Sequence, residues 1–238
     1  IMANPPFNQK DWRADNELLN DPRWRGYEVP QTGNANYAWI LNMVSKLSDN
    51  GVAGFILANG ALSGGSEEYK IRKKLIENGL VEAIVILPNK MFYTTDISVT
   101  LWIVNNNKNE RVVKLNDLER NYRDRKDEVL FMDLREKGVP FEKKYIQFTP
   151  QVTAEIAETY HKWQQNDIGY KDIPEYCYSA SIEEIKSKGF TLAASKYIEF
   201  INRDENINFD DKMSALQTEF SELLKEEEKS KRDLLNVF

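Results

Sequence analysis

Residues 52–88, with the sequence VAGFILANGALSGGSEEYKIRKKLIENGLVEAIVILP, decide the fold class. Two apolar runs, 52–58 and 82–88, stand on either side of a glycine-containing loop and a charged segment of helical length. Apolar runs of this length between turn residues are typical of strands that are buried on both faces. We expect the helix to have Ser66 as its cap and to end near Asn78. A strand, a helix and a second strand in this order predict an α/β sheet.

Further segments extend this pattern. The run VTLWIV (99–104) predicts a third strand, and the loop that joins it to 82–88 is too short to contain a crossover helix. These two strands should therefore pair antiparallel. The run 128–134 predicts one more strand. Apolar residues at helical spacing after Asn34 predict a helix that precedes the strand 52–58. Other helices are expected over 151–165, over 181–188 and from Asp210 onward.

The chain opens with IMANPPF (1–7), which we interpret as a buried strand end that runs into a rigid turn, since Pro5 and Pro6 cannot continue a central strand. α/β folds bind their ligands at the carboxyl ends of strands. There the Asn4 amide oxygen and the Pro5 carbonyl can accept hydrogen bonds from an amino group, and Phe7 offers a face to a planar ring. Such a site can direct the lone pair of an exocyclic amine toward an electrophile. The alternative is that NPPF is only a turn after a strand.

The composition limits the classes of protein that the chain can belong to. It has 238 residues, 41% hydrophobic and 29% charged, and no apolar run reaches the length of a membrane span. The one cysteine, Cys177, cannot form an intramolecular disulfide, and the one histidine, His161, leaves no cluster for a structural metal site. We therefore predict no metal and no membrane partner, with a reducing cytoplasm as the simplest compartment. The net charge of −6 is unusual for a chain that binds nucleic acid unaided.

The opening heptapeptide resembles the catalytic motif of amino-group methyltransferases that use S-adenosylmethionine. It looks most like the motif of the modification subunit of type I restriction–modification systems, an adenine-N6 DNA methyltransferase. Later segments are similar to this family in the same order, namely NYAWILNMVSKL (36–47), GFILANGALSGG (54–65), the block from EYKIRKKL to VTLWIV (68–104), LFMDLREKG (130–138) and FTLAASKYIEF (190–200). The resemblance covers most of the chain and is strongest in residues 1–104.

This resemblance implies a fold and a domain organisation. We expect the carboxyl half of a Rossmann-like S-adenosylmethionine-dependent methyltransferase sheet, followed by a mainly helical tail. In the family the cofactor-binding strands and their glycine-rich turn precede the NPPF strand, and the sequence contains no G-x-G-x-x-G fingerprint. The cofactor-contacting residues would then lie before Ile1, and this chain alone should be inactive. Residues 1–149 would form the catalytic half of the methyltransferase domain, and residues 150–238 a helical extension for subunit contact.

The resemblance also implies the roles of individual residues. Asn4 and the Pro5 carbonyl would hold the amino group of adenine, with Pro6 in the same rigid turn, and Phe7 would stack on a base that has left the duplex. Phe92, in the loop after ILPNK, is either a second wall around this base or a core aromatic that closes the last two strands. Two weaker candidates in the same loop are Tyr93 and Thr95.

DNA with a target adenine and the DNA-specificity subunit are the partners that the resemblance implies, and a restriction subunit is a further one. In the family the carboxyl-terminal helices pack against the specificity subunit, which reads the DNA and would account for the acidic charge of this chain. The expected contact is an apolar seam in the tail, formed by Met213, Leu216, Phe220, Leu223 and Leu224. The alternative is that this seam packs on the chain's own domain.

Two polar segments have simpler interpretations than a binding site. The loop 63–66 lacks the lysine of a P-loop and is expected to be a plain helix entry rather than a phosphate cradle. The run 120–128 (RNYRDRKDE) has charges of both signs and is expected to be a solvated face. A contact with the DNA backbone is the alternative for its arginines, Arg120, Arg123 and Arg125.

Two other functions remain open. Enzymes that methylate the side-chain amide of glutamine in proteins carry a similar Asn-Pro-Pro-aromatic motif, although they normally have tyrosine at the position of Phe7. A non-catalytic module that only bridges partners in an assembly is the other possibility.

Overall fold

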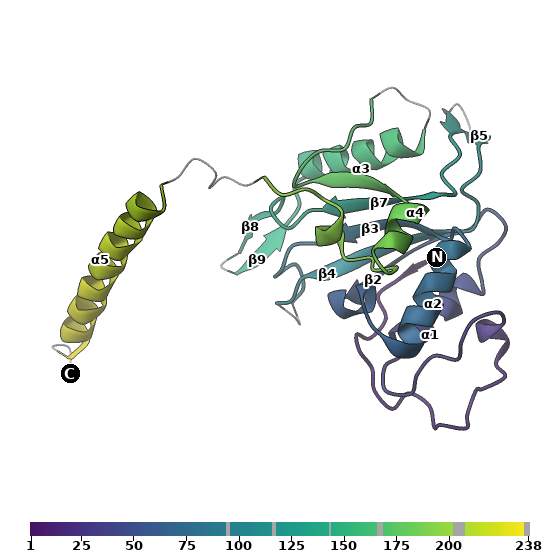
Figure 1. Ribbon diagram of the computed structural model, residues 1–238, viewed down its shortest axis with the longest axis horizontal. Helices are drawn as coiled ribbons and strands as arrows, with labels where there is room; N and C mark the ends of the chain where they lie inside the picture. Colours follow the sequence, from purple (N-terminus) through teal and green to yellow (C-terminus); the bar gives the residue numbers. More distant parts are fainter. Residues whose placement is uncertain (94–95, 116–117, 143, 166–168, 202–207, 236–238) are drawn as a thin grey trace. The chain divides into compact units, whose positions relative to one another are not determined.

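The computed structural model describes residues 1–93, 96–115, 118–142, 144–165, 169–201 and 208–235. These residues form two compact units, Ile1–Glu199 and Phe200–Phe238 (Figure 1). The first contains the sheet and most of the helices, and the second contains the long helix α5 (Phe209–Leu235). None of the helices in the described part of the chain has an apolar stretch that could cross a bilayer. The functional division at residue 149 that the sequence predicts is a separate matter and stays a prediction.

The first unit is built on a six-stranded mixed sheet. Its strands lie in the order β1 (Met2–Ala3), β2 (Val52–Ala58), β4 (Val99–Asn105), β3 (Val81–Ile86), β7 (Glu128–Asp133) and β10 (Cys177–Ser181). β1 pairs parallel with β2, and β3 pairs parallel with β7, whereas β4 is antiparallel to both β2 and β3. The predicted α/β class is confirmed, and so is the antiparallel pairing of 82–88 with 99–104.

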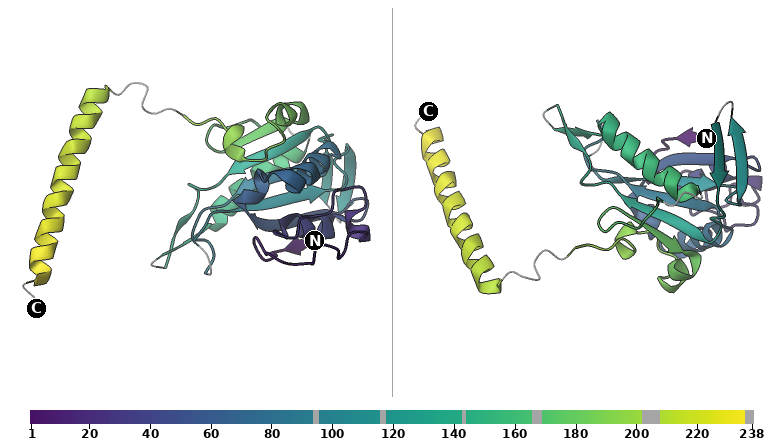
Figure 2. Two further views of the ribbon diagram at one scale, coloured as in Figure 1. Left: turned by 60° about the horizontal axis from the view of Figure 1, so that its bottom comes forward. Right: turned by 90° about the horizontal axis from the view of Figure 1, so that it is seen from above.

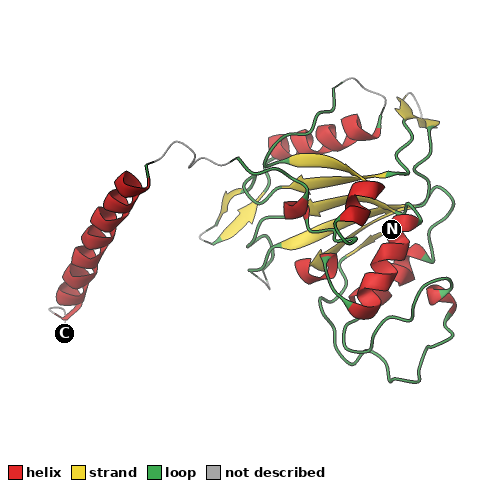
Figure 3. Cartoon of the chain, in the orientation of Figure 1, coloured by secondary structure: helices red, strands yellow, loops and turns green. Residues whose placement is uncertain are grey.

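Helices cover both faces of this sheet (Figures 2 and 3). Side chains of α1, α2 and α4 join one hydrophobic cluster with the strands, and side chains of α3 join a second cluster. The bounds are α1 Asn36–Val44, α2 Ser66–Glu77, α3 Pro150–Gln164 and α4 Ile182–Ser187, with 3₁₀ turns at Pro22–Trp24, Asn59–Leu62 and Ala194–Lys196. Two small hairpins complete the unit, β5 (Arg111–Leu115) with β6 (Leu118–Tyr122) and β8 (Val139–Phe141) with β9 (Tyr145–Gln147).

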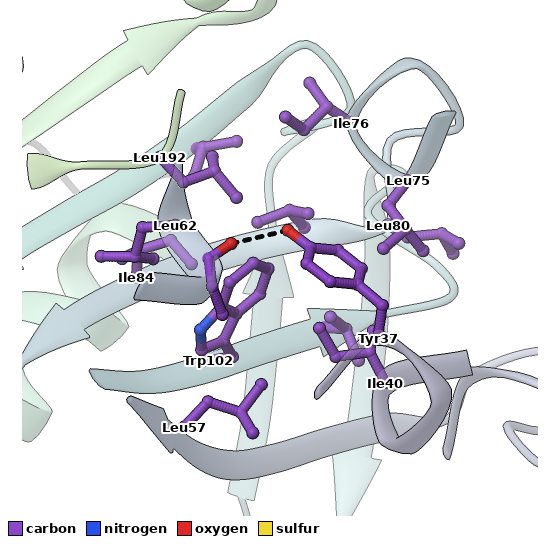
Figure 4. Close-up of a cluster of buried hydrophobic side chains, with 14 of the residues drawn as sticks. Tyr37, Ile40, Leu57, Leu62, Leu75, Ile76, Leu80, Ile84, Trp102 and Leu192 are labelled. Carbon is purple, nitrogen blue, oxygen red and sulfur yellow. Dashed lines mark hydrogen bonds between the residues drawn. The ribbon is translucent and has the colours of Figure 1, made fainter. Parts of the chain in front are cut away.

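Trp102 of β4 lies at the centre of the first cluster (Figure 4). Its indole is fully buried, stacks against Phe55 of β2 with ring centroids 6.1 Å apart, and meets the edge of Tyr37 of α1 at 6.4 Å. The Tyr37 hydroxyl donates a 2.7 Å hydrogen bond to the carbonyl of Ala61, just after β2. The central strand, its neighbour and the covering helix are therefore joined by one set of aromatic contacts.

Burial of the strands differs from the sequence-based expectation in two places. The strand end before NPPF, which was expected to be buried, is not, because β1 is the edge strand of the sheet: Met2 is 95% exposed and Ala3 is partly exposed. β3 is buried along its whole length, as expected. β2 is not, because Gly54 and Ile56 are partly exposed and Val52 is exposed. The second cluster explains this difference, since α3 packs chiefly with β3 and β7 and covers β2 less fully.

The predicted cap of α2 is wrong. Gly65 holds the cap position, no side chain there makes a capping hydrogen bond, and Ser66 is the first helical residue with a φ of 50°. The first turn is instead stabilised by the acidic Glu67 and Glu68, whose charge suits the positive end of the helix dipole.

The interpretation of 120–128 as a solvated face is wrong at Arg125. This guanidinium is fully buried, and its Nη2 donates to the Glu82 carboxylate at 2.8 Å. Asn105 donates to the second oxygen of Glu82 at 2.7 Å, and Gln164 donates to the first at 3.1 Å. Arg123 makes two hydrogen bonds to Glu128, of 2.8 and 2.7 Å. A carboxylate buried on β3 requires a cationic partner, which is why this charged run turns inward.

Replacement of Arg125 by methionine should lower the free energy of unfolding by about 3–5 kcal/mol, because it leaves the Glu82 carboxylate buried without its cation. Lys126→Met is the matched control, since Lys126 is the next residue and is exposed. Urea unfolding followed by circular dichroism measures both variants. Equal unfolding midpoints for the two variants would contradict a structural role of the buried pair.

Candidate functional site

The carboxyl ends of β1, β2, β3 and β7 lie along one edge of the sheet, together with the amino end of β4. Ala58, the last residue of β2, pairs with Val99, the first residue of β4. Ile86, the last residue of β3, pairs with Asp133, the last residue of β7. Asn4 follows β1 directly at this edge. Ligands of α/β folds bind at such an edge, so the NPPF turn occupies the place where a site is expected.

Asn4 and Pro5 present two hydrogen-bond acceptors there. Asn4 is exposed, and Pro5 is buried. Among the described residues, neither the Asn4 side-chain amide nor the Pro5 carbonyl takes part in a hydrogen bond. The pyrrolidine rings of Pro5 and Pro6 restrict the backbone of the turn. An amino group that approached this edge would therefore meet two free acceptors on a stiff chain.

Phe7 and Phe92 lie on the same face of the sheet. Both rings are partly buried and pack against the second hydrophobic cluster, which contains Leu87 and Val99 from the ends of β3 and β4. The structure thus places both aromatic residues that the sequence singled out against the same cluster. Packing of this kind fits a core aromatic as well as a wall of a base site, so the stacking role of each ring stays a prediction.

A buried amide fixes the turn that follows Phe7. Asn36, in the first turn of α1, is 1% exposed. Its Oδ1 accepts a hydrogen bond from the Asn8 backbone N–H at 3.0 Å, and its Nδ2 donates to Asn8 Oδ1 at 2.9 Å. Asn34 donates to the same Asn8 oxygen at 3.3 Å, and its own oxygen accepts the Asn36 N–H at 2.9 Å. Asn8 has a φ of 51°, which asparagine tolerates better than most residues.

A second set of hydrogen bonds joins three strand ends at the same edge. Thr100 of β4 donates to the Oδ1 of Asn59, just after β2, at 2.6 Å. Asn59 in turn donates to Ser98 at 3.5 Å, and the Ser98 hydroxyl donates to the Leu87 carbonyl, just after β3, at 2.7 Å. Sequence analysis found neither this set nor the Asn8–Asn36 pair, because both join residues that are distant in the chain. The only sequence signal was the repeated asparagine, Asn34 and Asn36, at the start of the predicted helix.

A pocket of about 360 Å³ opens beside the NPPF turn on the α1 side, lined by Ile1, Ala3, Asn4, Pro5, Trp39, Asn42, Met43 and Lys46. Its lining is mostly apolar, and Lys46 is the charged residue in it. The indole N–H of Trp39 is buried and has no hydrogen-bond partner within the described part of the chain. The pocket therefore offers apolar surface and one cation next to Asn4, and no carboxylate.

Other candidates from the sequence lie away from this edge or have structural partners. The carbonyl of Gly64 accepts a 2.8 Å hydrogen bond from buried Arg72, which suits a helix-entry loop rather than a phosphate cradle. Burial raises the pKa of the Cys177 thiol, and burial lowers the pKa of His161. Thr95 lies outside the described residues. Within those residues, no group of three or more His, Cys, Asp or Glu side chains is placed to hold a metal ion.

Comparison with known proteins gives one family and a consistent set of relatives. The family described as N-6 DNA Methylase matches residues 1–206. The type I restriction enzyme HindI methylase subunit of Haemophilus influenzae is 40% identical over 229 residues, which cover 95% of this chain and 47% of that protein. The MjaIX methylase subunit of Methanocaldococcus jannaschii is 32% identical over 248 residues, which cover 100% of this chain and 41% of that protein. The chain thus spans less than half the length of both relatives.

Solved structures show the same similarity. The methyltransferase subunit of a type I restriction-modification system from Streptococcus thermophilus is 26% identical with a TM-score of 0.69, over 84% of this chain and 38% of that one. The M protein of the type I restriction enzyme EcoKI has a TM-score of 0.56 at 16% identity, over 93% of this chain and 48% of that one. The second similarity is one of fold alone. Together they confirm the methyltransferase fold that the sequence predicts.

Replacement of Asn36 by alanine should loosen the turn after Phe7, because it removes both hydrogen bonds to Asn8. Loss of a buried hydrogen-bond partner costs about 1–3 kcal/mol, so hydrogen exchange at the Asn8 amide should become at least roughly fivefold faster. Asn42→Ala, the same substitution in the same helix, is the control. Mass-spectrometric or NMR hydrogen exchange measures both. Unchanged exchange at Asn8 in Asn36→Ala would show that the turn is held in another way.

Proposed function

Because the chain belongs to the N-6 DNA methylase family, we propose that it holds the target adenine in an adenine-specific DNA methyltransferase of the type I restriction–modification class. The observation that carries the proposal is the pair of free acceptors, the Asn4 amide and the Pro5 carbonyl, at the carboxyl edge of the sheet. The names of the curated relatives, which are methylase subunits of type I restriction enzymes, support it. Since the chain spans less than half of those relatives, the complete activity is proposed for the whole protein.

In this proposal Asn4 and Pro5 orient the nucleophile. The N6 amino group of adenine has two N–H bonds, and its lone pair is delocalised into the ring. Two acceptors that bind both hydrogens fix the direction of the lone pair and draw electron density onto the nitrogen. Pro5 and Pro6 contribute by restricting the backbone that carries these acceptors. Correct alignment of the amine with an electrophile accounts for much of the rate acceleration in such transfers.

The methyl donor is proposed to be S-adenosylmethionine, which supplies an electrophilic methyl group when bound. The described residues fit the acceptor side of the reaction and do not compose a cofactor site. The pocket beside Asn4 has no carboxylate to bind ribose hydroxyls, and the sequence contains no G-x-G-x-x-G fingerprint. We therefore assign no residue of this chain to the cofactor.

The base-stacking residue is proposed to be Phe7, with Phe92 as a second wall. An adenine inside a duplex cannot reach the Asn4 turn, so it must leave the stack, which costs a few kcal/mol. Stacking on an aromatic side chain is worth about 1–3 kcal/mol per base and can offset this cost. The common position of the two rings on one cluster supports their joint role.

The helix α5 is proposed to bind the DNA-specificity subunit. Its apolar seam is exposed, from 40% at Met213 to 63% at Phe220, and lies on a helix that is otherwise rich in charged residues. Exposed apolar stripes of this kind are typical of helix-to-helix docking. A partner that reads DNA would also supply the basic surface that a chain of net charge −6 lacks. A restriction subunit would join the same complex, and the DNA substrate places the proposed reaction in the cytoplasm.

Asn4→Ala should abolish methyl transfer in the intact gene product assembled with its specificity subunit. Loss of one preorganised hydrogen bond to the reacting group lowers the rate by about 10²–10³. Radiolabelled S-adenosylmethionine and duplex DNA give the readout, and Asn121→Ala, at an exposed position on β6, is the control.

Label at adenine N6 that disappears in Asn4→Ala and persists in Asn121→Ala is the expected result. Label on a glutamine side chain of a protein would show that the enzyme methylates protein instead of DNA. If the complex binds the cofactor but transfers label to neither DNA nor protein, a non-catalytic role in assembly would be the remaining function of this chain.

Phe220→Asp should prevent stable association with the specificity subunit, because it places a charge in the apolar seam. Burial of a phenylalanine contributes about 1.5–3 kcal/mol, so the dissociation constant should rise at least tenfold. Ser221→Asp adds the same charge at the adjacent residue and is the control. Size-exclusion chromatography of the co-expressed subunits measures association. Normal assembly of the Phe220→Asp variant would show that the specificity subunit does not bind at this apolar seam.

A further inference from the structure

The hairpin of β8 and β9 extends from the carboxyl edge of the sheet, beside the loop that follows β3 (Figure 1). The backbone N–H of Ile146 donates to the Lys90 carbonyl at 3.0 Å, which ties β9 to this loop. A Cβ added to Gly138, just before β8, would lie 2.1 Å from a methyl group of Ile146 and 3.4 Å from Pro88. The hairpin and the loop are thus closely packed, and their outer residues form one surface at the same edge as Asn4.

Two tyrosine rings meet on this surface. Tyr93 of the loop and Tyr145 of β9 have ring centroids 4.7 Å apart at an interplanar angle of 73°. Tyr93 is 73% exposed, and Tyr145 is partly exposed. Neither hydroxyl has a hydrogen-bond partner among the described residues. A ring pair that buries little area contributes little to the core, and its exposed faces are available to a ligand with a planar surface.

Two lysines belong to the same two segments as the rings. The ammonium group of Lys144 lies 5.1 Å from the centroid of the Tyr145 ring, and Lys90 is exposed at the base of the loop. Within the described ranges, neither lysine forms an ion pair, although Asp96 and Glu142 lie in the same two segments. Free ammonium groups beside exposed aromatic rings favour a polyanion with stacked rings over a protein partner.

We propose that Tyr93 and Tyr145, with Lys90 and Lys144, bind the DNA strand next to the target adenine. One ring stacks on a base that loses its neighbour when the adenine leaves the duplex, the other ring, at 73° to it, packs edge-on against the first, and the lysines bind the adjacent phosphates. Tyr93 directly follows Phe92, so the surface continues outward from the proposed base site. This inference rests on the proposed function, because it presupposes a flipped adenine at Asn4.

The test uses the intact methyltransferase complex and a fluorescent duplex that contains its target site. Tyr93→Ala and Tyr145→Ala should each weaken DNA binding roughly five- to hundredfold, as expected for loss of one base–aromatic stack. Tyr145→Phe, which keeps the ring, should bind as the wild type does. The double variant Lys90→Gln/Lys144→Gln should reduce the slope of log K against log[salt] by about two. Lys126→Gln, an exposed lysine at the opposite edge of the sheet, should leave this slope unchanged.

The wild-type complex separates the two levels of the proposal. If it methylates adenine while both tyrosine variants and the double lysine variant bind DNA with unchanged affinity and salt dependence, this surface is not a DNA contact and the proposed function stands. If it neither methylates adenine nor binds the duplex, the proposed function and this inference both fail. Loss of binding in Tyr145→Phe as well as in Tyr145→Ala would indicate a hydroxyl contact or a misfolded hairpin, and would overturn stacking at that position.

Discussion

The insertion of β4 between β2 and β3, antiparallel to both, is the constraint on which the rest of the structure depends. It brings the amino end of one strand to the edge where the parallel strands end. Trp102 fixes β4 from within by its contacts to Phe55 and Tyr37, and the Thr100–Asn59 hydrogen bond fixes its end. Because β4 has this direction, the short loop after β3 enters β4 at the same edge as the NPPF turn and the end of β2.

The strands and helices that surround this edge could be predicted from the sequence, because apolar runs and helical spacing reflect burial directly. The position of NPPF after a strand could be predicted because Pro5 and Pro6 cannot continue one, although β1 itself is not buried as expected. What could not be predicted depends on partners distant in the chain. Arg125 belongs to a charged run that looks solvated, and its burial is dictated by Glu82, which precedes it by 43 residues. The prediction that Ser66 caps α2 was wrong because its backbone adopts a positive φ, which the preference of serine for cap positions does not reveal.

The chemistry of the candidate site stays a prediction, whereas the contacts that support its turn could be found only in the structure. Asn4, Pro5 and Phe7 follow from residue type and strand end. The amide of Asn36, which holds Asn8 at 2.9 and 3.0 Å, does not, since asparagine before a helix normally indicates capping. Two acceptors can orient an amine only if the turn that carries them is rigid. The buried Asn36 and the two prolines supply this rigidity from opposite sides of Phe7, one by hydrogen bonds and the other by covalent geometry.

Under the proposed function, the acidic charge of the chain has a physical explanation. A net charge of −6 opposes DNA binding over the long range, where the field of the whole protein acts. At contact distance, screening limits each charge to its neighbours, so the lysines of the proposed DNA surface can act on a strand despite the net charge. General affinity can therefore come from a basic partner docked on α5, while local contacts at the carboxyl edge select the nucleotide that reaches Asn4. A strongly basic surface on this chain would instead hold any DNA near the site and weaken the partner's control over which adenine is modified.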